Sequence, residues 1–185
     1  MIQPNNAAEP SGKPETVGEI RNRARKNADA VLGQYWNGSL PVDPIQLARL
    51  AGTSVFSAQL GADTYGMIVG SGSSADIYVD VDQPLVRFRF TTAHELGHYI
   101  DHTVRGDRLP DSAGYLDRRS ESGRGQPAEI YANEFAASLL MPEDRVRDFA
   151  ESKHTLFEMA DIFQVSVAAM SWRLHHLGIS LVNDE

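Results

Sequence analysis

The hydrophobic residues of this chain recur at two different spacings. In residues 16–35, 128–141 and 155–178 they return every three or four positions, which is the period of a helix that buries one face. A shorter helix is predicted after Asp43, an N-cap residue that is followed by Pro44 at the first helical position. Three short runs are typical of β-strands, and the last two are joined by a glycine- and serine-rich connection: 54–58, 65–69 and 75–81.

These segments predict a single domain over residues 16–182, in which residues 143–178 form a helical C-terminal subregion. Residues 1–15 are rich in Pro, Asn, Gly and Ser and are predicted to be a disordered tail, and the polar residues 104–126 are predicted to be a long loop. The first helix carries a cluster of basic residues that we interpret as a solvated face rather than a contact with nucleic acid: Arg21, Arg23, Arg25 and Lys26.

Composition and charge narrow the chemistry. The chain has 185 residues, no cysteine and a formal net charge of -8. The lack of cysteine excludes thiolate metal sites, so any metal must be bound by His, Asp or Glu, and the negative charge argues against a protein devoted to binding phosphate backbones. No apolar run approaches the roughly 20 residues of a membrane-spanning helix, and the N-terminus lacks the pattern of a secretory signal. A cytoplasmic location without a membrane partner is therefore expected.

Residues 90–102 read FTTAHELGHYIDH and contain His94, Glu95 and His98 in the order H-E-x-x-H. Residues four apart lie on one face of a helix, so the two imidazoles could bind one metal ion. Glu95 would then be the general base that takes a proton from the attacking water. Two other interpretations stay open at this point, because Thr92 and Glu95 also fit a capping box and both histidines could be structural.

A third ligand would separate these interpretations. His102 continues the histidine stripe but lies a further turn, roughly 6 Å, beyond His98, which is too far for one ion to bind all three, so we interpret it as structural. The helix at 128–141 offers two carboxylates. Glu129 has Asn133 one turn later, where an amide could accept a hydrogen bond from a ligand histidine and fix its tautomer, and this pairing favours Glu129. Glu134 points about 140° away and is predicted to be solvated.

Two motifs, RFRFTTAHELGHYIDH and EIYANEFAASLLMP, resemble the ImmA/IrrE family of bacterial metallopeptidases. The second is the more specific, since E-x-x-A-N-x-F-A followed by L-L-M-P is characteristic of that family. The resemblance extends over residues 40–180 and leaves the first helix outside. It implies an α+β, gluzincin-like metallopeptidase fold in which a small β-sheet packs against helices, with helix-turn-helix-like helices at the C-terminal end.

The resemblance also implies a site and an activity. The site would hold one Zn²⁺ ion per chain, or Mn²⁺ or another divalent ion, through His94, His98 and Glu129, with Glu95 catalytic. Tyr115 and Tyr131 are the possible oxyanion donors. The implied activity is that of a zinc-dependent, site-specific endopeptidase that cleaves a helix-turn-helix transcriptional repressor and so derepresses a mobile element or a stress response. The alternative is a toxin–antitoxin component that binds a protein partner, has a structural metal and is not proteolytic.

The last two predicted helices have the spacing of a helix-turn-helix and raise the question of DNA binding. Residues 143–178 contain four basic and six acidic residues, a net charge of -2, which is a poor footprint for phosphates. The first turn of the second helix begins with Val167, Ala168 and Ala169, which offer no donors to base edges. We therefore expect packing or a protein partner here, and not direct contact with DNA.

Overall fold

The computed structural model describes residues 14–61, 64–71, 74–106, 115–118 and 125–181, with the side chains at 71 and 115–118 excepted. Most of the predicted tail and most of the loop predicted at 104–126 therefore lie outside the described residues. Within them, the elements in chain order are α1 (Val17–Tyr35), α2 (Pro44–Leu50), β1 (Thr53–Ala58), β2 (Thr64–Ser71), β3 (Ser74–Asp80), α3 (Leu85–Arg105), β4 (Tyr115–Arg118), α4 (Pro127–Leu140), α5 (Glu143–Glu151), α6 (Leu156–Phe163) and α7 (Val167–His176). None of the described helices combines the length and hydrophobicity that a bilayer crossing needs.

The four strands form one mixed sheet in the order β1-β3-β2-β4. β1 runs parallel to β3, whereas β2 is antiparallel to both β3 and β4. The three predicted strands are thus confirmed. β4 was not predicted and lies inside the segment predicted to be a loop. Its four residues are too few to show an alternating pattern, and its pairing with β2 is a long-range contact.

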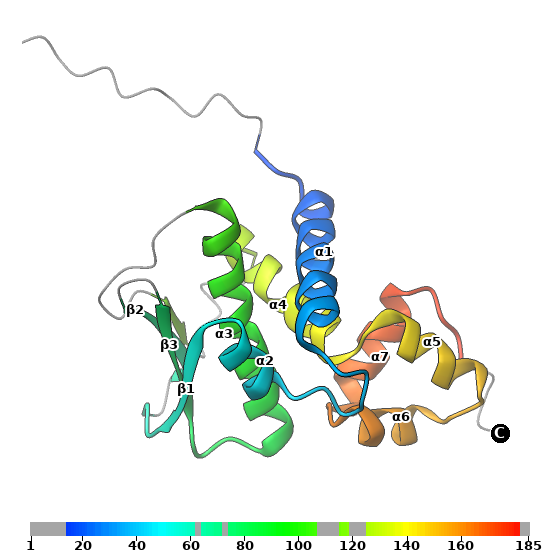
Figure 1. Cartoon of the computed structure of the whole chain (residues 1–185). Coiled ribbons are helices and arrows are strands. Elements are labelled where there is room, and N and C mark those ends of the chain that lie inside the picture. The colour runs from blue at the N-terminus through cyan, green and yellow to red at the C-terminus, as the bar shows by residue number, and fades with distance from the viewer. Residues whose placement is uncertain (1–13, 62–63, 72–73, 107–114, 119–124, 182–185) are drawn as a thin grey trace, which may run out of the picture.

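The fold is α+β, with the helices gathered on one side of the sheet (Figure 1). α3 packs against β2 and β3, α4 packs on α3, and α1 packs on α4. Strand residues that face α3, such as Ile68, Ile77 and Val79, are at most 1% exposed. This arrangement encloses α3 between the sheet and α4, which explains why a helix of mixed polarity is buried over its central turns.

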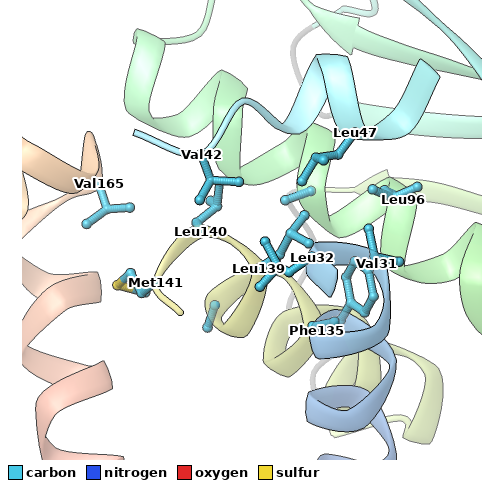
Figure 2. Packing of buried hydrophobic residues seen from close by; sticks show 14 of the residues in the cluster. Val31, Leu32, Val42, Leu47, Leu96, Phe135, Leu139, Leu140, Met141 and Val165 are labelled. Atoms are coloured by element: carbon cyan, nitrogen blue, oxygen red, sulfur yellow. The ribbon is translucent and has the colours of Figure 1, made fainter. Parts of the chain in front are cut away.

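One hydrophobic cluster joins helices that are far apart in the sequence (Figure 2). Among its members are residues of α1, α2, α3 and α4, of the segments next to α2 and α4, and of the turn between α6 and α7: Val31, Leu32, Val42, Leu47, Leu96, Phe135, Leu139, Leu140, Met141 and Val165. The first helix, which the resemblance leaves outside, therefore shares its core with the two helices that carry the candidate site.

Two buried arginines tie the C-terminal helices to this core. Arg173 of α7 is 2% exposed, and its Nε donates to the carbonyl of Met141 at the end of α4, at 3.0 Å. Arg89 of α3 donates through Nη2 to the carbonyl of Val42 at 2.6 Å and through Nε to that of Gln164, the C-cap of α6, at 3.2 Å. Arg173, one of the four basic residues of the C-terminal subregion, is therefore turned inward, away from any phosphate.

Capping side chains hold several helix starts, and the N-cap predicted at Asp43 is confirmed. Thr16 with Glu19 and Thr155 with Glu158 form complete capping boxes, and the Asp43 side chain accepts from the first turn of α2. The capping alternative for Glu95 is wrong, however. α3 begins at Leu85, so Thr92 and Glu95 lie in the helix interior, and the Thr92 hydroxyl donates to the carbonyl of Phe88 at 2.9 Å.

Two predictions about charged residues are also wrong. Glu134 is not solvated but 1% exposed, with Arg25 Nη1 at 2.9 Å, Arg21 Nε at 3.7 Å and Arg173 Nη1 at 4.0 Å. Correspondingly, the basic face of α1 is not simply a solvated surface, because its arginines pair with carboxylates of α3 and α4. The helical period shows which way a side chain points, but it does not show which element lies opposite.

Candidate metal centre

The central turns of α3 carry the two histidines. His94 and His98 are 3% and 2% exposed, and their Nε2 atoms lie 3.1 Å apart, as expected of residues one turn apart on one helix face. The face they occupy is turned toward α4, which brings Glu129 in its first helical turn opposite them. Helical spacing on α3 and the packing of α4 on α3 thus bring three potential ligands together.

Glu129 offers one carboxylate oxygen to each imidazole. Its Oε2 lies 3.4 Å from Nε2 of His94, and its Oε1 lies 3.3 Å from Nε2 of His98. Among the described residues, these three make up the group of His, Asp and Glu side chains whose ligand atoms converge closely enough to hold a metal ion. His102, which was expected to stand outside the ligand set, is not in the group.

The spacing of these atoms fits a zinc ion. Ligands about 2.0–2.1 Å from a tetrahedrally coordinated Zn²⁺ lie about 3.3–3.4 Å from one another. The two Nε2 atoms are 3.1 Å apart, and the two oxygens of Glu129 each lie 3.3–3.4 Å from one of them. With one ligand atom from each residue, the three atoms lie within 4.8 Å of one another. Two imidazole nitrogens and one carboxylate are also a donor set that zinc accepts, and they leave a fourth position for water or substrate.

The electrostatics of His98 and Glu129 favour the protonation states that metal binding requires. Burial lowers the pKa of His98, against the opposing effect of Glu129, so the imidazole is neutral near pH 7. Burial by itself would raise the pKa of Glu129, but hydrogen bonds with His94 and His98 lower it well below its ordinary value. A neutral imidazole and an ionised carboxylate are the forms that bind a metal.

Asn133 holds one of the ligand histidines in place. Its Oδ1 lies 3.2 Å from Nδ1 of His94, which can donate its proton there and leave Nε2 free to bind a metal. Asn133 is one turn beyond Glu129 on α4, so one face of that helix supplies both a carboxylate and the group that orients a histidine. The contact expected from the sequence is therefore present.

Glu95 is turned toward the sheet, about 100° around α3 from His94 and about 60° from His98. Its side chain is fully buried, and a Cβ atom added at Gly66 of β2 would lie 2.9 Å from Glu95 Oε1 and 2.5 Å from Thr91 Cγ2. Only a glycine at this position lets β2 approach α3 so closely. Sequence reasoning missed Gly66, although a glycine inside a strand often marks such an approach.

Gly97 has a similar role between the two ligand helices. A Cβ atom there would lie 3.2 Å from Cα of Ala132 and 3.1 Å from Cδ1 of Phe135, both on α4. Glycine in a helix interior is unfavourable by about 1 kcal/mol relative to alanine. A glycine at this position of a predicted helix could therefore have indicated a close contact with another element. The close approach at Gly97 brings α3 and α4 near enough for His98 and Glu129 to meet.

The two candidate oxyanion donors differ in their placement. Tyr131 is fully buried and its hydroxyl is bonded by Nδ2 of Asn27 at 2.7 Å, so it points to α1 and is not available to a substrate. The assignment of Tyr131 as an oxyanion donor is therefore corrected. Tyr131 is two residues after Glu129, which places it about 200° around α4 from that carboxylate. Tyr115 lies in β4 and pairs with Ile68 of β2. Its side chain lies outside the described atoms.

Comparison with known proteins provides a family. No curated protein was similar enough to this chain to count as a relative. By structure, the chain is similar to a Mycobacterium tuberculosis transcriptional regulator, with a TM-score of 0.57, 20% sequence identity, and coverage of 87% of this chain and 52% of that one. That likeness shows a shared fold alone, and the chain spans about half the length of that regulator. The model of the family Peptidase_M78, the IrrE N-terminal-like domain, matches residues 48–175, well over half of the chain. The chain therefore belongs to this family of metallopeptidase-type proteins.

Proposed function

We propose that the chain is a zinc-dependent endopeptidase that cleaves a helix-turn-helix transcriptional repressor. The observation that carries the proposal is the convergence of His94, His98 and Glu129 at separations of 3.1–3.4 Å, beside Glu95 of the same helix. A peptidase family and a metal-binding donor set together support hydrolysis of a peptide bond. The repressor as substrate is supported by the resemblance to the ImmA/IrrE family and remains the finer part of the proposal.

Each residue has a distinct task in this reaction. A zinc ion held by His94, His98 and Glu129 would supply the Lewis acid that polarises the scissile carbonyl and acidifies a water. Glu95 accepts the proton that the attacking water loses and passes it to the amine of the leaving peptide. Asn133 keeps His94 in one tautomer. Tyr115, from the edge strand β4, is the remaining candidate for a donor to the oxyanion.

The direct test uses the purified chain, Zn²⁺ and a small helix-turn-helix repressor encoded by a neighbouring gene. The expected result is one divalent ion per chain and a single cut in the repressor, with cleavage abolished in Glu95→Gln although the ion is retained. A wild-type chain without stoichiometric metal, or undiminished cleavage by Glu95→Gln, would overturn the proposal. A generic substrate such as casein is a poor test, because narrow-specificity proteases often leave it intact.

The complete burial of Glu95 favours a second candidate function, in which the metal is structural and the chain binds a protein partner as part of a toxin–antitoxin pair. The same two variants separate the candidates. For the second candidate, Glu95→Gln keeps full biological activity and His94→Ala loses it. For the peptidase, both variants lose it.

A further inference from the structure

α1 lies entirely before the residues that match the family, yet it contacts both helices that carry the candidate ligands. The contact is polar as well as hydrophobic. On one face of α1, Arg23 reaches Asp101 of α3, and Asn27 reaches the hydroxyl of Tyr131 on α4. These contacts lie next to the ligands, since Asp101 is three residues after His98 and Tyr131 is two residues after Glu129.

Arg23 is the residue that connects the two ligand helices. One of its guanidinium nitrogens, Nη1, donates to Oδ1 of Asp101, and its Cζ lies 4.5 Å from the centre of the Tyr131 ring. A planar guanidinium can make both contacts at once, donating in its plane and stacking with its face. Glu15, just before α1, accepts from Nε and Nη2 of Arg23 at 3.0 and 3.1 Å and so keeps the group in this orientation.

The first turn of α4 depends on such outside support. Gln126 at its N-cap makes no side-chain hydrogen bond to the helix, so no local cap holds the turn that contains Glu129. The hydroxyl of Tyr131, bonded by Asn27 at 2.7 Å, and the Tyr131 ring under Arg23 hold that turn against α1.

We propose that Arg23 is a positioning residue of the metal centre: by binding Asp101 and stacking on Tyr131, it sets the separation between His98 on α3 and Glu129 on α4. The proposal rests on the proposed function only in requiring that the three ligands bind a divalent ion. According to this proposal, α1 affects the affinity of the site for metal in addition to stabilising the fold. Arg23→Ala should not unfold the protein, because Arg105 Nε still reaches Asp101 Oδ1 at 3.1 Å.

The test measures the affinity of the full chain for Zn²⁺ by competition with a chromophoric chelator, and the visible spectrum of the Co²⁺-loaded chain. Loss of a residue that orients metal ligands typically lowers affinity about 10- to 100-fold. We expect at least the lower value for Arg23→Ala, together with weakened tetrahedral Co²⁺ bands. Arg23→Lys keeps a charge near Asp101 but cannot stack its face on Tyr131, so its affinity should fall between those of Arg23→Ala and the wild type.

Two control variants separate positioning from stability. Lys26→Ala removes an exposed cation from the same helix and should leave affinity within twofold of wild type. Ile20→Val trims the buried side of α1 and should lower stability with affinity likewise unchanged. The inference is overturned if Arg23→Ala has the affinity and spectrum of the wild type. It is also overturned if Arg23→Ala and Ile20→Val lose zinc affinity in the same proportion to their loss of stability. If the wild-type chain binds neither ion, the proposed function falls as well, and the two failures are thereby distinguished.

Discussion

The close approach of β2 to α3 at Gly66 makes the substitution Gly66→Ala a sharp test of how Glu95 is held. The added Cβ would lie 2.5 Å from Cγ2 of Thr91, whereas carbon atoms in good contact are about 3.5–4.0 Å apart, so one of the two must move by roughly 1 Å or more. Rotation of Thr91 does not relieve the clash cheaply, because its hydroxyl donates to Oε1 of Gln83 at 3.1 Å. Overpacking of this kind costs about 1–3 kcal/mol in the free energy of unfolding.

The variant should also displace Glu95, whose Oε1 and Cγ would lie 2.9 and 3.2 Å from the new methyl group. A misplacement of about 1 Å can reduce a catalytic rate roughly 100-fold, so the proposed peptidase activity should fall further than stability alone explains. Zinc affinity should remain near wild type, because His94, His98 and Glu129 converge on the side of α3 that faces α4.

The assay is urea denaturation of Gly66→Ala, Thr91→Ser, their double variant and Gly33→Ala, with cleavage and zinc affinity measured on each. Thr91→Ser removes the clashing methyl group and keeps the hydroxyl, so Gly66→Ala with Thr91→Ser should recover most of the stability but little of the activity. Gly33→Ala is the matched control, since a Cβ there meets nothing within 4 Å. The reasoning is refuted if Gly66→Ala unfolds within about 0.5 kcal/mol of wild type, the range of ordinary surface substitutions, or if Thr91→Ser recovers no stability.

Four further outcomes are expected. Removal of metal with a chelator should lower the melting temperature and Zn²⁺ should restore it, since about 2.7 kcal/mol is gained at a ligand concentration 100 times Kd; an unchanged scanning-fluorimetry transition would contradict this. Asn133→Ala should weaken Zn²⁺ binding about 10- to 100-fold in a chelator competition. Arg173→Ala should cost about 1–3 kcal/mol in urea, because it removes the donor to Met141 and Ser138 while Glu134 keeps Arg25, and a loss below about 0.5 kcal/mol would count against its bonded role. Burial lowers the pKa of His98 in the folded state, whereas the imidazole of the unfolded chain binds a proton at about pH 6.5. Stability of the metal-free chain should therefore be full above that pH and fall below it, with a flatter profile in His98→Gln.

The candidate site was largely predictable because its parts are local. His94 and His98 follow from helical spacing, and Asn133 marks Glu129 because both lie on one helix face. The misplaced residues all depend on what lies opposite a helix. Glu134 was placed correctly around α4 relative to Glu129, but no local pattern shows that α1 covers Glu134 and Tyr131. Gly66 and Gly97 were missed for the same reason, since close contact between two elements leaves only a weak mark in the sequence.

β4 shows a different limit. Its four residues pair with β2 at positions such as Met67 and Leu116, which are 49 residues apart (116 − 67). A strand this short has too few residues to show alternation, and its stability comes from the neighbouring strand rather than from its own composition. Polar residues around it therefore predict a loop, and the fourth strand becomes visible only once the sheet is assembled.

The inward-facing guanidinium of Arg173 determines whether the C-terminal helices can be separated from the rest of the fold. α6 and α7 have the spacing of an independent module, yet Arg173 donates to the carbonyl of Met141 and, at 3.3 Å, to the hydroxyl of Ser138, both of which belong to the end of α4. A helix pair excised and grafted elsewhere would take with it a buried charge that has lost its acceptors, and would leave behind an α4 whose last turn is open to water. Cutting the chain before α5 should therefore destabilise both products, so α6 and α7 are not a module that can be exchanged without α4.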